Sequence, residues 1–201
     1  MRWQSLVPPV VLFLVLVFGG YVFLLRDAGG EDSLHGTLID PPMNVPGFTL
    51  SSAQGPVALE DFRGETVVLF FGYTACPDYC PTTMSRLTRA MELLGEEEEE
   101  IQVIMVSVDP DRDTPERVGR YVSAFHPDFL GLSGSPREIA DVASDFGIYY
   151  GRASSSTGAG YLVDHSTTVT VLGPQGRVRL LWPFDMTGEE MAEDLRYLLR
   201  S

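Results

Sequence analysis

The chain has 201 residues and a formal net charge of −14, with 28 acidic side chains against 14 basic ones. An acidic excess of this size repels phosphate backbones and anionic lipid surfaces, which disfavours nucleic-acid binding and polybasic membrane binding. Every basic residue is an arginine, which excludes Schiff-base and P-loop lysine chemistry, and the 2 cysteines allow at most one disulfide.

The first 26 residues differ in composition from the rest of the chain. A run of 20 residues without charge, from Leu6 to Leu25, lies between Arg2 and Arg26. As a helix this run would span roughly 30 Å, the thickness of the hydrocarbon core of a bilayer. We therefore expect residues 1–26 to form a single-pass membrane anchor; a cleaved signal peptide, which normally has a shorter apolar core, is the alternative.

Residues 27–44 are rich in glycine, aspartate and proline and are expected to form a tether. The acidic remainder, residues 45–201, is expected to fold on the exported, periplasmic side of the inner (cytoplasmic) membrane, because the short N-terminal tail is easily left in the cytoplasm. Two closely spaced cysteines in such an oxidising compartment need either a disulfide or a metal.

The first part of the domain shows strand patterns followed by a helix pattern. Residues 48–51 and 56–59 bracket a turn-like sequence and predict a β-hairpin. Residues 66–72 are a continuous β-branched and aromatic run, which is expected of a buried central strand. Residues 81–94 predict a helix with Met84, Leu87, Met91 and Leu94 at helical spacing; its methionines are expected to fill the core and not to bind a metal. Residues 101–108 predict a second buried strand.

The capping residues Thr114, Ser135 and Thr187 predict three further helices in the second part of the domain. They are expected at residues 115–125, 136–147 and 188–200. Residues 167–172 and 177–182 flank a glycine- and proline-containing turn and predict a β-hairpin ahead of the last helix. This order of elements predicts a three-layer α/β domain with a mixed sheet.

Both cysteines follow the first predicted buried strand directly, in the sequence FGYTACPDYCP at residues 71–81. Because Pro81 suits the first helical position, Cys80 is expected at or near the N-cap of the helix and Cys76 in the loop before it. Free N–H groups and the helix dipole favour thiolates there, so both cysteines are candidate nucleophiles or metal ligands. A structural disulfide is the alternative, although closing so short a loop gains little entropy.

The three histidines occupy different contexts. His165 lies in the sequence YLVDHST, immediately before the predicted hairpin, and is a candidate ligand or a hydrogen-bonded loop residue; Asp164 is a candidate partner for its ring, although adjacent side chains usually point apart. His35 lies in the tether and is expected to be exposed without a role. His126 ends a predicted helix, where a cation is favourable.

Three stretches of the chain resemble, in order and spacing, motifs of the Sco/SenC family of membrane-tethered copper-binding proteins. They are the cysteine segment at residues 71–81, the sequence SVDPDRDTP at 107–115, and VDHST at 163–167 ahead of a strand and the turn GPQG. The resemblance covers about residues 45–200. It implies a thioredoxin-like three-layer domain with a mixed central sheet and an N-terminal β-hairpin.

The resemblance also implies a ligand set. By position, copper would be bound by Cys76, Cys80 and His165. Two thiolates and one imidazole suit Cu(I) and can hold Cu(II) through the imidazole, whereas a closed zinc site normally has a fourth protein ligand. The sequence departs from the family pattern at Ala75, where many relatives carry a histidine, and at Tyr79, where a small aliphatic residue is usual. The loss of a nearby base at Ala75 would tune copper affinity without removing a ligand.

The second motif supplies charged residues that are not expected to be ligands. Asp109, Arg112 and Asp113 lie between a predicted strand and a predicted helix. Short acidic side chains in that position commonly fix loops and cap helices. We therefore expect these three residues to hold the loop in place.

The resemblance implies a copper chaperone that delivers copper to the binuclear copper site of cytochrome c oxidase subunit II, or reduces the cysteines of that site. Other copper carriers or thiol reductases would be further partners. The residues leave an enzyme open: a membrane-tethered thiol-disulfide oxidoreductase that uses Cys76 and Cys80, although such enzymes usually space the pair by two residues. A peroxiredoxin-like peroxidase is a third hypothesis, but it would need a Thr-x-x-Cys sequence, and Thr74 and Cys76 are separated by one residue only.

Overall fold

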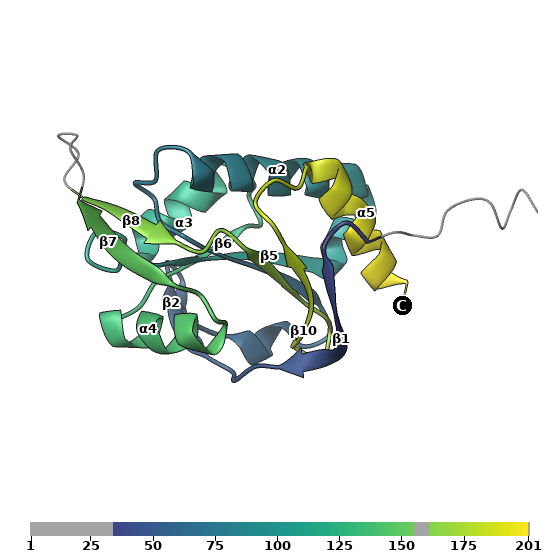
Figure 1. The fold of residues 1–201 in the computed structure, drawn as a ribbon, viewed down its shortest axis with the longest axis horizontal. Coiled ribbons are helices and arrows are strands. Elements are labelled where there is room, and N and C mark those ends of the chain that lie inside the picture. Colours follow the sequence, from purple (N-terminus) through teal and green to yellow (C-terminus); the bar gives the residue numbers. More distant parts are fainter. Residues whose placement is uncertain (1–33, 155–160, 201) are drawn as a thin grey trace, which may run out of the picture. The chain divides into compact units, whose positions relative to one another are not determined.

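The computed structural model describes residues 34–154 and 161–200. The predicted membrane anchor falls outside these residues, and none of the helices within them is long and apolar enough to cross a membrane. The described residues are built around one six-stranded sheet (Figure 1). In spatial order its strands are β1 (Thr37–Asn44), β10 (Arg177–Trp182), β9 (Val169–Leu172), β4 (Thr66–Gly72), β5 (Ile101–Ser107) and β6 (Leu130–Leu132).

The sheet is mixed, as the sequence predicts. β4 and β5 are parallel, and so are β5 and β6, whereas β9 runs antiparallel to β4. All seven residues of β4 are buried, because the strand lies in the interior of the sheet with helices over both faces. This is the environment in which a continuous apolar run is stable as a strand.

Helices cover both faces of the sheet and complete the three layers. Figure 1 shows α2 (Tyr79–Leu94), α3 (Pro115–Ser123) and α5 (Gly188–Leu199) on one face and α4 (Pro136–Asp145) on the other. Met84, Leu87 and Met91 of α2 are at most 2% exposed, so the predicted core role of the methionines is confirmed. The predicted caps are confirmed too, since Thr114, Ser135 and Thr187 each accept a backbone N–H bond at their helix start.

The predicted N-terminal hairpin is present as β2 (Thr49–Ser52) and β3 (Gly55–Ala58). Phe48, just before this hairpin, packs against the ring of Phe146, just after α4, and Phe146 also packs against Phe71, with centroid distances of 6.1 and 5.8 Å. The aromatic residues of three separate segments thus share one part of the core.

The structure differs from the sequence prediction at the tether. Residues 37–44 were expected to belong to it, but they form β1, which pairs antiparallel with β10. Prolines interrupt the alternation of apolar and polar residues in this segment, so no strand pattern is visible. Its strand conformation comes from pairing with a segment about 140 residues later in the chain.

A buried carboxylate holds the backbone just before β1 in place. Asp194 of α5 is 1% exposed and accepts the backbone N–H groups of His35 and Gly36 at 2.8 and 2.9 Å. It also accepts the indole N–H of Trp182 at 2.9 Å. His35 is exposed, as expected, and its Nε2 lies 2.7 Å from Glu193 at the surface; this hydrogen bond raises the pKa of His35.

Two strands that the sequence analysis did not predict form a separate hairpin. β7 (Tyr150–Ser154) and β8 (Tyr161–His165) pair antiparallel with each other in a two-stranded sheet. Figure 1 shows this arm beside the main sheet, on the side away from α5. His165 was expected in a loop, and it is instead the last residue of β8.

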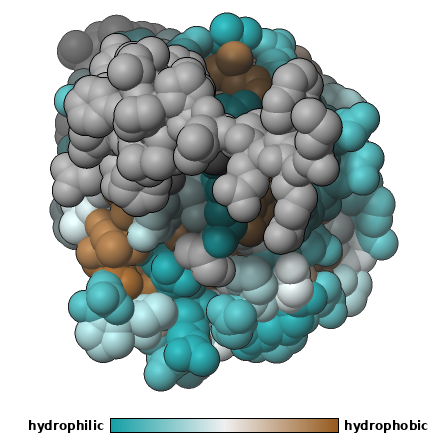
Figure 2. Space-filling model, turned by 90° about the vertical axis from the view of Figure 1, so that its right-hand side faces the viewer, coloured by the Kyte–Doolittle hydropathy of each residue, from teal (hydrophilic) through white to brown (hydrophobic). Residues whose placement is uncertain are grey.

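Figure 2 shows the side that lies to the right in Figure 1; the part of it that grey atoms leave uncovered is mostly hydrophilic, with a few hydrophobic areas. The glutamate run lies in a short 3₁₀ turn after α2, from Gly95 to Glu100, none of which is buried. Among the described residues, the exposed large apolar side chains are Leu38, Met43, Tyr79 and Tyr149.

Candidate metal centre

The cysteine segment connects the end of β4 to the first turn of α2. The helix begins at Tyr79 with Asp78 as its N-cap, so Cys80 is the second helical residue and Cys76 lies in the preceding loop. The start of the helix therefore lies two residues earlier than Pro81 suggested. The N–H group of Cys80, which has no partner within the helix at this position, donates to the sulfur of Cys76 at 3.4 Å.

A glycine at the end of β4 allows the helix to approach this closely. A Cβ atom on Gly72 would lie 3.0 Å from the sulfur of Cys80 and 2.7 Å from the ring of Phe70. Both contacts are shorter than ordinary van der Waals distances. Gly72 therefore leaves room for the thiol, which is fully buried against the strand.

His165 reaches the cysteines from the separate hairpin. Its Nε2 lies 3.6 Å from the sulfur of Cys80, and its Nδ1 lies 2.8 Å from the carbonyl oxygen of Ser166. Because a carbonyl only accepts, this bond places the ring proton on Nδ1 and leaves the lone pair of Nε2 facing the sulfurs. The rings of Phe70 and Tyr73 meet the imidazole edge-on, at centroid distances of 6.2 and 5.8 Å.

The structure brings the three sequence-predicted residues together. The sulfur atoms of Cys76 and Cys80 and a ring nitrogen of His165 all lie within 4.8 Å of one another, and both cysteines are free thiols. Asp164 is exposed, so the carbonyl of Ser166 orients the imidazole in its place. His126 lies elsewhere, beside the start of β5.

The two sulfurs share one proton. The hydrogen bond from the Cys80 thiol is the largest cause that lowers the pKa of Cys76 to about 3, against the opposing effect of burial. The backbone N–H groups of Cys80 and Asp78 stabilise the same thiolate. Donation to Cys76, together with burial, raises the pKa of Cys80. The metal-free site therefore holds one thiolate and one thiol, and a soft cation can take the place of the shared proton.

This donor set suits a soft metal ion with an open coordination position. Two sulfurs and one imidazole nitrogen favour Cu(I), and the imidazole also accommodates Cu(II). Among the described residues the cluster contains no fourth cysteine, histidine, aspartate or glutamate. A closed tetrahedral zinc site would normally have one.

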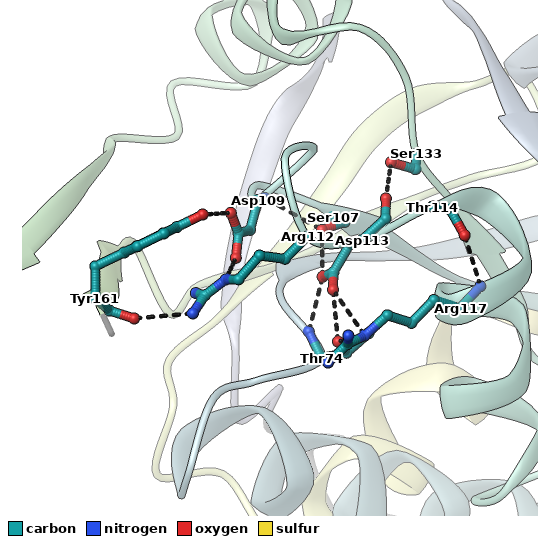
Figure 3. A network of polar contacts seen from close by, with 9 residues as sticks. All are labelled: Thr74, Ser107, Asp109, Arg112, Asp113, Thr114, Arg117, Ser133 and Tyr161. Carbon is teal, nitrogen blue, oxygen red and sulfur yellow. Dashed lines mark hydrogen bonds and ion pairs between the residues drawn. The ribbon is translucent and has the colours of Figure 1, made fainter. Parts of the chain in front are cut away.

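The second motif anchors the cysteine segment (Figure 3). Asp113 is 1% exposed and accepts the backbone N–H of Thr74 at 2.8 Å and its hydroxyl at 2.5 Å. The same carboxylate accepts the hydroxyl of Ser107, at the end of β5, at 2.7 Å. Arg117 donates to the Thr74 hydroxyl at 2.8 Å. The loop before Cys76 is thereby tied to the neighbouring strand.

The same motif also contacts the histidine hairpin. Asp109 accepts the hydroxyl of Tyr161, the first residue of β8, at 2.6 Å and forms an ion pair with Arg112. Arg112 donates to the backbone oxygen of Tyr161 at 3.0 Å. The expectation that Asp109, Arg112 and Asp113 hold the loop in place is confirmed. Sequence reasoning assigned no structural role to Thr74 and Tyr161, although both lie inside stretches that it singled out, FGYTACPDYCP and YLVDHST.

Comparison with known proteins identifies relatives over nearly the whole described domain. The SCO1/SenC family model matches residues 39–200. The SCO2-like protein of Rickettsia prowazekii is 30% identical over 204 residues, which cover 96% of this chain and 98% of the relative. The solution structure of apo Sco1 from Thermus thermophilus has a TM-score of 0.77 and 44% identity, and the match covers 85% of this chain and 99% of that one.

A copper-bound structure is also similar. Arabidopsis thaliana ScoI with copper bound has a TM-score of 0.73 and 31% sequence identity. The match covers 78% of this chain and 98% of that one. The thioredoxin-like fold with a mixed sheet that the sequence predicts is therefore confirmed.

Proposed function

The chain belongs to the SCO1/SenC family, and we propose that it is a copper chaperone that carries the ion on Cys76, Cys80 and His165. The ion would be delivered to the binuclear copper site of cytochrome c oxidase subunit II, or the same thiols would reduce the cysteines of that site. One observation carries the proposal: two buried sulfurs and a preoriented imidazole nitrogen, from two separate segments, lie within 4.8 Å of one another. The copper-bound state of a relative with 31% identity supports copper as the ion.

Three ligands suit an ion that has to be released again. An incoming ligand from a partner can enter the open position before the existing bonds break. The two thiolates hold Cu(I) in a soft environment, and the imidazole adds the donor that Cu(II) prefers. Loss of His165 should therefore affect the two oxidation states unequally.

The proposal is tested by ranking the ligands in the full chain. Cys76→Ala and Cys80→Ala are expected to abolish binding of both oxidation states, because one thiolate and one imidazole form only a two-donor site. His165→Ala is expected to weaken Cu(II) by at least about tenfold and Cu(I) much less, since even residues behind a ligand commonly change metal affinity by that factor. Competition with a Cu(I) chelator and the thiolate-to-Cu(II) absorption band measure the two affinities.

His126→Ala is the matched control for this ranking, because it removes an imidazole that lies beside the start of β5. It should bind copper as the unsubstituted chain does. If His165→Ala behaved like His126→Ala, the imidazole of His165 would not be a ligand and the proposed site would be wrong.

A thiol-disulfide oxidoreductase is the second candidate, favoured by the Cys76 thiolate beside the Cys80 thiol. The Cys76 thiolate would attack a disulfide of the substrate, forming a mixed disulfide and releasing one substrate thiolate. Cys80, after losing its proton, would attack the sulfur of Cys76 and release the second thiolate. The substrate gains two electrons and the chain becomes the Cys76–Cys80 disulfide. Exchange of this kind should be unaffected by His165→Ala, whereas Cu(II) binding should weaken.

The proposed location follows from the sequence. Residues 1–26 would anchor the chain in the inner (cytoplasmic) membrane, a short segment after them would act as a tether, and the copper-binding domain would lie on the periplasmic side. The start of β1 at Thr37 shortens the tether that we propose from residues 27–44 to about ten residues. A short tether would keep the site near a membrane-bound oxidase.

A further inference from the structure

The position of His165 is not set by the main sheet. Among the described strands, β7 and β8 pair only with each other. A cavity of about 150 Å³ lies between this hairpin and the loop after β5, lined by Val108, Asp109 and Pro110 of the loop and by Tyr150, Gly151 and Val163 of the hairpin. Side-chain contacts, and not pairing with the main sheet, therefore hold the hairpin against the domain.

Alternate residues of β8 face the domain. Successive side chains in a strand point to opposite sides, so Tyr161, Val163 and His165 share one face. Val163 on this face is 5% exposed, whereas Asp164 on the other is exposed. Tyr161 and His165 are thus the two ends of the inward face, roughly 13 Å apart at the usual rise per strand residue. Fixing Tyr161 fixes one end of the strand whose other end carries the imidazole.

Tyr161 is contacted at its hydroxyl, its backbone oxygen and its ring (Figure 3). Its hydroxyl donates to Asp109 at 2.6 Å, and its backbone oxygen accepts from Arg112 at 3.0 Å. The guanidinium carbon of Arg112 lies 3.8 Å from the centre of the Tyr161 ring. Asp109 is 2% exposed and pairs with Arg112, so the two charges are largely removed from water and hold each other in place.

The same arginine reaches the aromatic wall of the metal site. The guanidinium carbon of Arg112 lies 5.8 Å from the centre of the Tyr73 ring, and the ring of Tyr73 meets that of His165 edge-on at 5.8 Å. The Tyr73 hydroxyl also forms a hydrogen bond with the backbone of Val163 in β8. Burial is the main cause that raises the pKa of Tyr73. Arg112 therefore contacts β8 directly and, through Tyr73, the surroundings of the imidazole.

We propose that Asp109, Arg112 and Tyr161 form a positioning clamp that sets the distance of His165 from the two sulfurs and thereby the affinity of the site for Cu(II). This inference rests on the proposed function, because it assigns His165 as the ligand that distinguishes the two copper states. Asp113 holds the cysteine segment from the same loop, so residues 107–113 fix both ligand-bearing segments relative to each other. The clamp residues act through His165 and do not bind the ion.

Tyr161→Phe in the full chain tests the clamp, because it removes the hydroxyl bonded to Asp109 and keeps the ring that packs under Arg112. Cu(II) binding is expected to weaken about tenfold, the usual lower limit for a residue that orients a metal ligand. The thiolate-to-Cu(II) absorption band should shift, while Cu(I) affinity should stay within about twofold. Tyr149→Phe is the matched control, since it removes a hydroxyl from a residue that adjoins the same hairpin and is 72% exposed. It should leave both affinities unchanged.

The same substitution in a His165→Ala background shows whether the effect passes through the imidazole. There Tyr161→Phe should cost no further Cu(II) affinity, because the ligand that it positions is gone. An equal loss in both backgrounds, or no loss in either, would overturn the clamp. A readout without copper separates this result from a failure of the proposed function: in the metal-free chain, amide hydrogen exchange of β8 should be faster in Tyr161→Phe than in Tyr149→Phe. Unchanged exchange would also overturn the clamp.

Discussion

At the scale of single residues, the centre of the site is a pair of sulfurs with opposite pKa shifts. The hydrogen bond from the Cys80 thiol lowers the pKa of Cys76 to about 3, and the same contact together with burial raises that of Cys80. At a pH between its folded and unfolded pKa values, Cys76 is a thiolate in the folded chain and a thiol in the unfolded chain. This thiolate stabilises the fold fully above the unfolded pKa of about 8.5, and the contribution decreases as the pH falls toward the folded pKa.

Because the Cys80 thiol donates to Cys76, substitutions of Cys80 are expected to change the pKa of Cys76. Cys80→Ala removes the largest cause of the shift and is expected to raise the pKa of Cys76 toward the ordinary thiol value of about 8.5. Cys80→Ser keeps a hydroxyl donor in the same place and should keep the pKa low. Alkylation of the reduced, metal-free full chain by iodoacetamide between pH 5 and 8 measures the difference.

The rate for Cys80→Ser should be nearly constant over this range, because Cys76 is a thiolate throughout. The rate for Cys80→Ala should rise by about tenfold per pH unit below its pKa, as the thiolate fraction does. Identical profiles for the two variants would mean that the N–H groups at the helix start, and not the Cys80 thiol, hold Cys76 as a thiolate.

At the scale of elements, the loop after β5 holds the cysteine segment in place. Hydrogen bonds of 2.5 to 2.8 Å join the segment after β4 to the end of β5; Asp113 accepts them from Thr74 and Ser107. Asp113 is 1% exposed, so its charge is stable only because these donors and Arg117 surround it. Removing the carboxylate would leave the Thr74 N–H and the Ser107 hydroxyl without this acceptor.

We therefore expect Asp113→Ala to lower the free energy of unfolding by about 3 kcal/mol, the size measured when one partner of a buried charged network is lost. Asp111→Ala is the matched control: this aspartate lies in the same loop but pairs with Arg152 at the surface. Its loss should cost about 0 to 1 kcal/mol. Denaturant titration of the metal-free full chain compares the two, and equal losses would contradict a structural role for the Asp113 network.

At the scale of the whole molecule, the site lies where the parallel strands end. The cysteine segment follows β4, and the loop of residues 107–113 follows β5, its parallel neighbour. Loops after adjacent parallel strands meet at one edge of the sheet, the usual position of ligand sites in such folds. The β7–β8 hairpin adds the imidazole at this same edge, so residues about 90 positions apart in the chain form one centre.

The proposed membrane anchor gives a prediction for the intact protein. Because residues 6–25 form an apolar run long enough to span a bilayer, the chain is expected to stay with the membrane fraction after high-salt and carbonate washing. Fractionation followed by N-terminal sequencing tests this expectation. Release of a soluble chain with a new N-terminus between residues 20 and 36 would show that the segment is a cleaved signal peptide.

The sequence by itself determined the elements whose signals are local. The apolar run of β4, the caps at Thr114, Ser135 and Thr187, and the helical spacing of Met84, Leu87 and Met91 are each readable within a few residues, and all were found where they were expected. The motif residues Cys76, Cys80 and His165 were identifiable for the same reason. Each belongs to a short stretch with a recognisable pattern.

Only the tertiary structure decided the features that depend on distant partners. β1 is a strand because it pairs with β10, and β8 is held beside the main sheet by Asp109 and Arg112, about 50 residues earlier in the chain. The tautomer of His165 and the proton shared by Cys76 and Cys80 likewise follow from contacts that exist only in the folded chain. Local patterns report backbone propensity and burial, whereas the spacing of the two ligand-bearing segments is set by hydrogen bonds between segments far apart in sequence.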